Sequence, residues 1–308
     1  MSILVTGASG FVGAHLCKKL VEKGKNVIGL EHDHKPETTL KCLGFEDKIT
    51  VIHGEVTNEN LLRRIISQYN VDTVYHLAAQ AIVAVALKDP ITTFHSNVIG
   101  TVTLLNVCKD MPQVKRILIP STDKVYGEGL NRKEDDALNA EGIYEISKIG
   151  MDYVARSFYH VFNLPIVVTR ACNIYGEYDF NRRIIPNTIR ALKAGQQPVI
   201  FKNEDSIREY IHVEDVCDAY MFLVENIDKT KGNVFNVGTG AVAKQDEVVK
   251  YCIKVSGLNV EPKFIEKDKD LFEIHQQTID SKKIRDLGWK PKFKSLEEGL
   301  EESWKKWV

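Results

Sequence analysis

Residues 3–13, ILVTGASGFVG, limit the fold of this chain more than any other stretch. Residues 3–5 are an aliphatic run of the kind that forms a buried parallel strand. Three glycines follow at intervals of three, and a helical pattern begins after them. Such glycines allow a tight turn, a close approach of backbone N–H groups to phosphate, and a helix packed against its strand. The stretch therefore predicts the opening of a dinucleotide-binding unit, with these residues at the pyrophosphate: Gly7, Gly10, Phe11, Val12 and Gly13.

The ends of later predicted strands carry residues that suit the rest of such a cofactor. Glu31 follows the predicted strand at 26–30. A carboxylate at that point accepts hydrogen bonds from both adenosine ribose hydroxyls and repels a 2′-phosphate, which favours NAD over NADP. The predicted strand at 71–77 ends in Leu77, Ala78 and Ala79, and small residues there let a cofactor lie against the backbone.

Composition and charge argue against several classes of partner. The chain has 308 residues and a formal net charge of −1, so we expect neither a nucleic-acid nor a membrane-surface partner. No apolar run approaches the length of a membrane span, and the first predicted strand begins at residue 3, which leaves no room for a signal peptide. The six cysteines are scattered without metal-ligand spacing, so we expect reduced thiols in a cytoplasmic protein and no metal site.

Strands and helices alternate through the first half of the chain, which predicts an α/β fold with a doubly wound parallel sheet of the Rossmann type. After about residue 170 the alternation breaks, and residues 233–237 form a predicted strand that rejoins the first sheet. A helix is predicted to start in residues 208–216. We therefore expect an NAD-binding domain at 1–170, joined by about 213–240, and a smaller, interleaved substrate-binding lobe within 171–308.

Polar side chains follow the predicted strand at 116–119, where Thr122, Asp123 and Lys124 stand in sequence. The carboxyl ends of parallel strands face the crevice in which ligands bind, so these residues are candidates for a catalytic site. Tyr144 and Lys148 lie one helical turn apart and share a helix face. The free phenol has a pKa near 10, and a neighbouring ammonium together with a positively charged nicotinamide lowers it. Tyr144 is therefore a candidate base for a substrate hydroxyl.

The order of these motifs resembles the extended branch of the short-chain dehydrogenase/reductase superfamily, the NAD-dependent epimerases and dehydratases of nucleotide sugars. The resemblance is carried by the glycine spacing, by Thr122, by Tyr-x-x-x-Lys at 144–148 and by Asn-x-x-Gly-Thr at 97–101, and it covers nearly the whole chain. It implies NAD as cofactor and a nucleotide-diphosphate sugar as substrate. It also implies oxidation of the sugar at C4, with Tyr144 as the base and Thr122 orienting the hydroxyl.

The resemblance implies further contacts. Those to the cofactor are Glu55, Val56, Asn97, Tyr144 and Lys148. Those to the substrate are Gln80, Thr122, Asn173, Arg183, Arg208 and His275. Guanidinium groups match phosphate oxygens, which suits Arg183 and Arg208 to the diphosphate. The resemblance also implies a homodimer, in which helices at about 95–109 and 144–162 pair with their symmetry mates through apolar residues including Ile149, Tyr153 and Phe158.

Asp123 and Lys124 bear on the step after C4 oxidation. Many 4,6-dehydratases of the family carry Thr-Asp-Glu here, with Asp as the acid for the C6 hydroxyl and Glu as the base for the C5 proton. Asp-Lys is similar to the CDP-glucose 4,6-dehydratases, as is the segment 273–275 before Ile279 and Asp280. The chain departs from that pattern at Thr122, where Ser is expected, and at Ala84, where Arg is expected.

We therefore expect a CDP-glucose-type 4,6-dehydratase of polysaccharide biosynthesis that oxidises C4, eliminates water across C5 and C6, and returns hydride to C6. Lys124 has two candidate roles: a neutral amine that accepts the C5 proton, or an ammonium that stabilises the enolate. A 4-epimerase of the same family is the first alternative. A nucleotide-binding protein that kept the fold and lost catalysis is the second.

Overall fold

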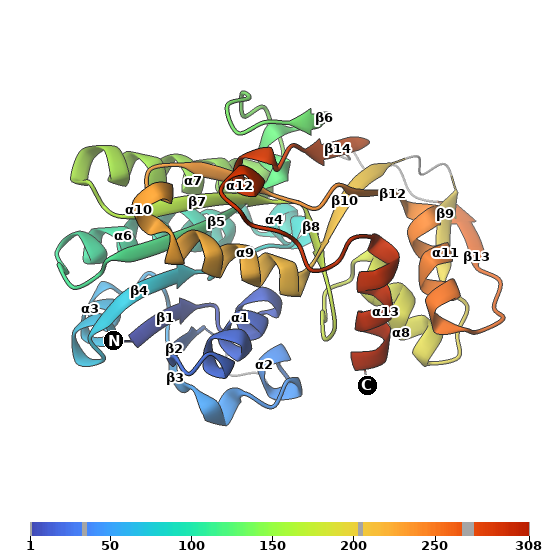
Figure 1. Cartoon of the computed structure of the whole chain (residues 1–308), viewed down its shortest axis with the longest axis horizontal. Helices are drawn as coiled ribbons and strands as arrows, with labels where there is room; N and C mark the ends of the chain where they lie inside the picture. Colours follow the sequence, from blue (N-terminus) through green and yellow to red (C-terminus); the bar gives the residue numbers. More distant parts are fainter. Residues whose placement is uncertain (1, 33–35, 203–205, 267–273, 308) are drawn as a thin grey trace.

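The computed structural model describes residues 2–32, 36–202, 206–266 and 274–307. Within these ranges the largest element is a seven-stranded parallel sheet in the order β11-β7-β5-β4-β1-β2-β3 (Figure 1). Its aliphatic strands are buried because helices cover both faces. The strands are β1 (Ser2–Thr6), β2 (Asn26–Glu31), β3 (Thr50–His53), β4 (Val71–His76), β5 (Arg116–Thr122), β7 (Ile166–Ala171) and β11 (Val234–Val237).

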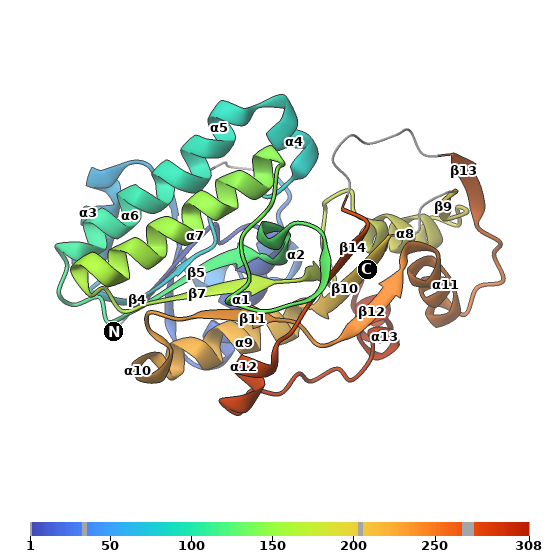
Figure 2. The same ribbon diagram turned by 90° about the horizontal axis from the view of Figure 1, so that it is seen from above.

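Two layers of helices enclose this sheet (Figure 2). On one face, Leu62, Leu104 and Met151 join a core made with α3, α6 and α7. On the other face, Leu16 and Leu223 join a core made with α1 and α9. The helices around this sheet are α1 (Phe11–Glu22), α2 (Thr39–Cys42), η1 (Glu46–Lys48), α3 (Glu59–Gln68), α4 (Val83–Lys88), α5 (Pro90–Phe94), the π-helical η2 (His95–Ile99), α6 (Gly100–Lys109), η3 (Asp123–Tyr126), α7 (Ile143–Phe162), α9 (Val213–Glu225), α10 (Ile227–Thr230) and α12 (Lys282–Asp286).

A second, smaller sheet lies beside the carboxyl ends of the first and runs in the order β12-β10-β14-β6, with β8 paired to β10. A two-stranded sheet, β13-β9, lies at the far end of the molecule (Figure 1). Three helices enclose a third core with these strands, α8 (Ile184–Lys193), α11 (Gln245–Ser256) and α13 (Leu296–Lys306). The strands are β6 (Gly129–Arg132), β8 (Asn173–Tyr175), β9 (Val199–Lys202), β10 (Ile207–His212), β12 (Ala241–Lys244), β13 (Lys263–Glu266) and β14 (Gln276–Ile279).

The doubly wound parallel sheet predicted from the sequence is confirmed, and β11 pairs with β7 as the strand expected to rejoin that sheet. The helix predicted to start in residues 208–216 is placed too early. Ile207–His212 form strand β10, because its backbone pairs with β12 on one side and with β8 and β14 on the other. His212 then caps α9, accepting the Glu214 N–H at Nδ1 over 3.2 Å, so the helix begins at Val213.

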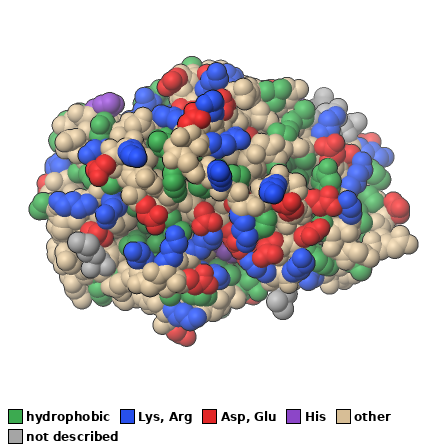
Figure 3. Space-filling model, in the orientation of Figure 1, with side chains coloured by type: hydrophobic (Ala, Val, Ile, Leu, Met, Phe, Trp, Pro, Cys, Tyr) green, Lys and Arg blue, Asp and Glu red, His purple; other side chains and the backbone are tan. Residues whose placement is uncertain are grey.

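The face of the molecule drawn in Figure 3 carries acidic and basic side chains in alternation, without a broad region of one sign. This distribution agrees with the net charge of −1. In the part of the chain that the structure describes, no helix is both long enough and apolar enough to cross a bilayer.

Candidate active site

The turn between β1 and α1 leaves no room for side chains at two of its glycines. Gly7 has a φ of +72°, and a Cβ at this position would lie 2.8 Å from the Ala78 nitrogen. A Cβ on Gly13 would lie 2.1 Å from the Gly7 oxygen, so only glycine lets α1 begin this close to β1. The N-terminus of α1 faces the carboxyl ends of β1 and β4, with Phe11 and Val12 in its first turn. This geometry fits a dinucleotide pyrophosphate.

Glu31 ends β2 and is 2 % exposed, at the place where an adenosine ribose would meet the sheet. Glu55 follows β3 and is exposed, and one of its oxygens lies 3.5 Å from His32 Nε2. Val56 packs over Gly100, where an added Cβ would lie 2.6 Å from its methyl group. These residues border the same end of the sheet as the glycine turn, which suits the adenosine half of NAD.

Asn97 ties the end of β4 to helix α7. Its side chain accepts from the Gln80 N–H over 2.8 Å and donates to the Gln80 carbonyl over 3.0 Å. It also donates to Ser147 Oγ over 2.8 Å, and Ser147 donates to the Tyr144 carbonyl. Asn97 lies in the π-helical turn η2, a distortion that is frequent at functional sites. In the described structure Asn97 is therefore a brace between the strand end and the Tyr144 helix.

A buried histidine extends this brace. His76 is 0 % exposed, with Nδ1 2.9 Å from Thr6 Oγ1 and Nε2 3.0 Å from Thr101 Oγ1. Burial lowers the pKa of His76 to about 3, so the ring is neutral. Thr101 donates to the Asn97 carbonyl and Thr6 accepts from the Ala78 N–H, which assigns the His76 proton to Nε2. This network was not predicted from the sequence, where its one signal is a histidine inside a buried strand.

Thr122, Tyr144 and Lys148 come together at the end of β5. All three are buried, and Tyr144 is hydrogen-bonded to Thr122. Lys148 donates to the Pro120 carbonyl over 2.6 Å, and burial lowers its pKa to about 8. Burial raises the pKa of Tyr144 to about 12, more than the Arg183 charge and the Thr122 hydrogen bond lower it. The protein's own groups therefore keep the phenol protonated, and a further positive charge is required before it can act as a base.

A buried ion pair fixes the helix that carries these residues. The Arg170 guanidinium on β7 donates to both oxygens of Asp152 on α7, over 2.9 and 3.2 Å. Arg170 also donates to the Tyr126 hydroxyl at the end of η3 over 2.8 Å. The clamp joins β7, α7 and η3, so it positions Tyr144 relative to Asp123. The spacing of these charged residues in the sequence did not suggest their pairing.

Asp123 and Lys124 begin η3 beside Thr122, whose hydroxyl donates to Asp123 Oδ1 over 3.1 Å. Asp123 is 1 % exposed, and its other oxygen has no hydrogen-bond partner in the described structure. Burial raises the pKa of Asp123 to about 6, against the opposing effect of Lys124. Burial also lowers the pKa of Lys124, with further lowering by Arg208 and Arg183. Burial therefore favours the neutral acid and the neutral amine.

A hollow of about 220 Å³ opens next to Lys124 and is bordered by Asn173, Arg183 and Arg208. Arg208 lies on β10 and donates to the carbonyls of Ile207 and His275, each over 3.1 Å, which holds its guanidinium in place. Asn173 donates to the Glu209 carbonyl over 3.1 Å. The structure thus brings together two cations and an amide that can meet a diphosphate.

Three predicted substrate contacts, Gln80, Thr122 and His275, do not border this hollow. Gln80 uses its amide locally, donating to the Ile82 carbonyl over 2.9 Å and accepting from the Ile82 N–H over 2.6 Å. His275 is exposed, and its backbone carbonyl is the part that faces Arg208. Glu273, which supported the CDP-glucose pattern, lies outside the described residues.

The sequence match spans most of the Rossmann sheet. Residues 3–238 match the family model described as the NAD dependent epimerase/dehydratase family. The chain belongs to the NAD-dependent epimerase/dehydratase family. It is an NAD-dependent nucleotide-sugar enzyme with a Rossmann-type sheet.

Relatives within the family divide between two reactions. A dTDP-D-glucose 4,6-dehydratase of Dictyostelium discoideum is 31% identical, over 98% of this chain and 80% of that protein. A UDP-glucose 4-epimerase of Halalkalibacterium halodurans is also 31% identical, over 99% of this chain and 95% of that protein. The solved structure of dTDP-glucose 4,6-dehydratase from Bacillus anthracis, in complex with NAD, is 26% identical with a TM-score of 0.88, covering 99% of this chain and 96% of that one.

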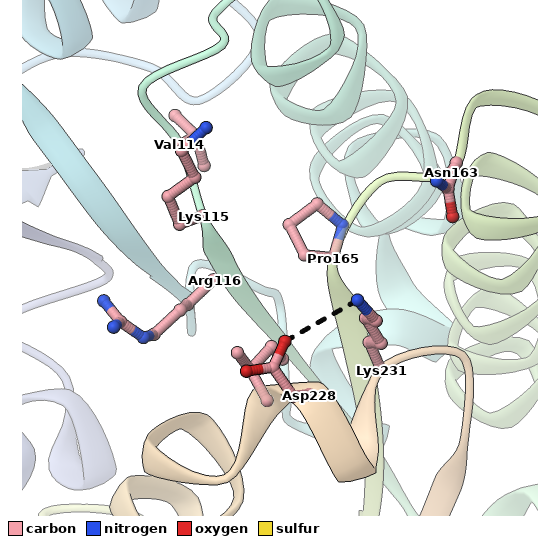
Figure 4. A pocket seen from close by; sticks show the side chains of 8 residues that line it. Val114, Lys115, Arg116, Asn163, Pro165, Asp228 and Lys231 are labelled. Carbon is pink, nitrogen blue, oxygen red and sulfur yellow. Dashed lines mark ion pairs between the residues drawn. The ribbon is translucent and has the colours of Figure 1, made fainter.

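A second hollow, of about 350 Å³, lies at the amino ends of β5 and β7 (Figure 4), and Thr122, Tyr144 and Lys148 are not among the residues that line it. Its cations already have partners: Arg116 pairs with Asp72 over 3.1 Å, and Lys231 lies 3.7 Å from Asp228. Within the described ranges, no group of three or more His, Cys, Asp or Glu side chains is arranged to hold a metal ion.

Proposed function

We propose that this protein is an NAD-dependent nucleotide-sugar 4,6-dehydratase of the CDP-glucose type. The observation that carries the proposal is Asp123, a buried carboxyl with a pKa of about 6 and one oxygen without a partner, held beside Thr122 and Lys124. Two neighbouring groups whose surroundings favour the neutral acid and the neutral amine are what an elimination requires. A 4-epimerase has no use for such a pair.

The proposed reaction starts at the C4 hydroxyl. Bound NAD supplies the hydride acceptor for C4 and, later, the hydride donor for C6. Thr122 hydrogen-bonds the C4 hydroxyl and orients it, and Tyr144 accepts its proton. Lys148 and the positive charge of the cofactor together favour the phenolate, which the protein alone does not. The cofactor residues in this proposal are those of the glycine turn and the strand ends, including Gly10, Glu31, Ala79 and Asn97.

The elimination then uses Asp123 and Lys124. Lys124, as a neutral amine, takes the C5 proton made acidic by the C4 ketone, and the electron pair of that bond forms the C5–C6 double bond. The C6 hydroxyl leaves with the proton of Asp123 as water. When C6 is reduced, the Lys124 ammonium returns a proton to C5. Burial lowers the pKa of Lys124, which is the direction that this role requires.

The rest of the substrate is proposed to lie along the hollow beside Lys124. Arg208 and Arg183 face the diphosphate, and Asn173 donates to the same group. In this division, residues 1–170 with 213–240 hold the cofactor, and the lobe within 171–308 holds the nucleotide. The CDP-glucose assignment rests on the Asp-Lys pair, since relatives of both reaction types are equally similar.

We also propose a homodimer formed through α7 and the segment η2–α6, residues 95–109. Tyr153 is 52 % exposed, as this requires, and Ile149 and Phe158 are half-buried against the two cores of the monomer. The apolar residues that remain exposed on these helices are Ile99, Ile146, Tyr153, Val161 and Phe162. A monomeric mass at micromolar concentration would contradict the dimer.

Six free cysteines fit a reducing compartment, which supports a cytoplasmic enzyme of polysaccharide precursor synthesis.

One incubation tests the proposed reaction class. The NAD-loaded protein is given CDP-glucose, UDP-glucose and dTDP-glucose separately, and the masses of the products are measured by mass spectrometry. A dehydratase gives a product lighter by one water, and we expect the largest yield with CDP-glucose. A product of unchanged mass that contains the galactose epimer would support the 4-epimerase. No reaction with any of the three would favour the non-catalytic alternative.

A further inference from the structure

One buried side chain next to the site has no partner among the described residues. Gln277 lies on β14 and is 0 % exposed, yet neither its Oε1 nor its Nε2 makes a hydrogen bond. Buried amides are almost always paired, so an exception in a folded protein requires an explanation. Its neighbour Gln276 is exposed, since successive side chains of a strand point to opposite faces. Gln277 is therefore a polar group kept at a buried position where the described residues supply no partner.

The strand register places Gln277 on the face of the candidate site. Gln277 pairs with Arg208 on β10 and with Gly129 on β6, and paired residues of neighbouring strands carry their side chains on the same face. Arg208 borders the hollow that Lys124 also borders. Strand β14 also packs against η3, which begins at Asp123. Gln277 thus stands on the strand that pairs with β10 at Arg208 and that packs against η3.

The neighbours of Gln277 leave both donors and acceptors unused. The Arg208 guanidinium is occupied with the backbone carbonyls of Ile207, Ile274 and His275. Gly129 has no side chain, and the Arg132 guanidinium lies over it, with its Nε buried and without a partner. Asp123 Oδ2 is likewise without a partner among the described residues. In the described structure, the unpaired buried side-chain atoms of β14, β6 and η3 are the donors Gln277 Nε2 and Arg132 Nε and the acceptors Gln277 Oε1 and Asp123 Oδ2.

This mixture distinguishes a sugar from a phosphate. A phosphate oxygen only accepts hydrogen bonds, whereas each sugar hydroxyl both donates and accepts. An unpaired amide, carboxyl oxygen and guanidinium N–H on neighbouring elements therefore match a pair of hydroxyl groups better than they match a diphosphate. The two cations that suit a diphosphate, Arg183 and Arg208, lie together at the neighbouring hollow.

We propose that Gln277 binds the hexose: its amide makes hydrogen bonds to a hydroxyl group of the sugar and contributes to selecting the sugar rather than the nucleotide. The inference rests on the proposed function, in that the substrate is a nucleotide sugar. It requires neither the dehydratase nor the epimerase reaction, because both act on a bound hexose.

The test is a binding measurement on Gln277→Met, which keeps the length of the side chain and removes the amide. The parent protein and the Gln277→Met variant both carry Tyr144→Phe to prevent turnover, and both are loaded with NAD. Titration calorimetry compares CDP-glucose with CDP, and the UDP and dTDP pairs are run alongside. We expect Gln277→Met to weaken the binding of the nucleotide-glucose about tenfold, the equivalent of about 1.4 kcal/mol, and to leave the affinity for the nucleoside diphosphate unchanged. Gln276→Met, the same change on the exposed face, should alter neither.

A second measurement separates binding from structure. The amide makes no hydrogen bond to the described residues, so Gln277→Met should unfold at the same temperature as its parent or higher when no ligand is present. Equal weakening of the binding of both ligands, or no weakening of either, would overturn the inference. If Gln277→Met unfolds at a lower temperature or does not fold, the binding test is repeated with Gln277→Asn, which shortens the reach of the amide and should give the same selective loss. If the parent binds none of the nucleotide sugars, the proposed function itself fails, and the inference with it.

Discussion

Replacing Asp123 by Asn should make the protein more stable and almost inactive in elimination. The pKa of Asp123 is about 6, against 3.8 for an unperturbed aspartate, because the side chain is buried. One pKa unit corresponds to about 1.4 kcal/mol, so ionising Asp123 costs the folded state about 3 kcal/mol. The folded protein therefore holds this proton more tightly than the unfolded chain does. Stability is lost as the pH rises from about 4 to about 6, and the whole penalty is present at pH 8.

Asp123→Asn has no charge to bury, so the free-energy cost of ionising a buried carboxyl disappears. Urea unfolding of the protein without ligands should show the variant more stable than wild type at pH 8, by up to about 3 kcal/mol, and equal to it at pH 4. Asp135→Asn is the matched control: Asp135 is exposed on the loop after β6, and its replacement should change stability by less than about 0.5 kcal/mol at both pH values. A variant that is less stable than wild type at pH 8 would refute the assignment of Asp123 as a destabilised, functional acid.

The same substitution should remove the acid from the reaction. Loss of a general acid costs about 10² to 10⁴ in rate, whereas oxidation at C4 depends on Tyr144 and should continue. In the wild type, the protonated fraction of Asp123 falls about tenfold for each pH unit above 6, while the neutral fraction of Lys124 rises, so the pH dependence of the rate does not isolate the acid. The assay therefore compares release of water by product mass between wild type and Asp123→Asn at the same pH. Elimination retained in Asp123→Asn would rule out this acid.

Three further predictions concern other parts of the structure. Tyr144→Phe should keep its fold and its affinity for the nucleotide sugar while C4 oxidation falls by orders of magnitude, and near-normal turnover would reject Tyr144 as the base. Gly10→Val puts a branched side chain where a Cβ alone lies 3.3 Å from the Gly7 oxygen, so calorimetry should show the loss of NAD binding; unchanged affinity would mean that the site is misplaced. Burial lowers the pKa of His15 to about 4 and that of His212 to about 3. As the pH drops below about 6.5, the unfolded chain therefore binds protons at these histidines before the folded protein does, and the folded protein loses stability. The urea midpoint of His15→Gln should accordingly change less between pH 7 and pH 5 than that of wild type.

Local patterns in the sequence were enough to predict the parallel sheet and the residues at its strand ends. The glycine turn, Thr122 and the pair Tyr144 and Lys148 are each set by neighbours within a few residues, so their spacing carries the information. The strand containing Arg208 could not be predicted from such local patterns. Its residues Arg208 and Glu209 are polar and do not alternate with apolar ones, and they are buried because β10 lies inside a sheet in which it pairs with three other strands.

The remaining features depend on contacts between distant segments. Strand β6 comes from the first half of the chain and joins the second sheet by pairing Gly129 with Gln277. Nothing near Gln277 in the sequence indicates that it will be buried beside Arg208. Likewise, His76 and Thr101 meet because β4 and α6 pack together, and the clamp of Arg170 on Asp152 joins a strand to a helix. Such polar pairs depend on the fold and can be read only after it is known.

The central claim is that the site eliminates water across C5 and C6, and the most direct test is the reaction in deuterated water. The NAD-loaded wild-type protein is given its preferred nucleotide-glucose, and the product is examined by NMR. If Lys124 exchanges the C5 proton with solvent, the product is a 4-keto-6-deoxy sugar with deuterium at C5. A mixture of C4 epimers that keeps hydrogen at C5 and has lost no water would contradict the dehydratase and replace it with the 4-epimerase.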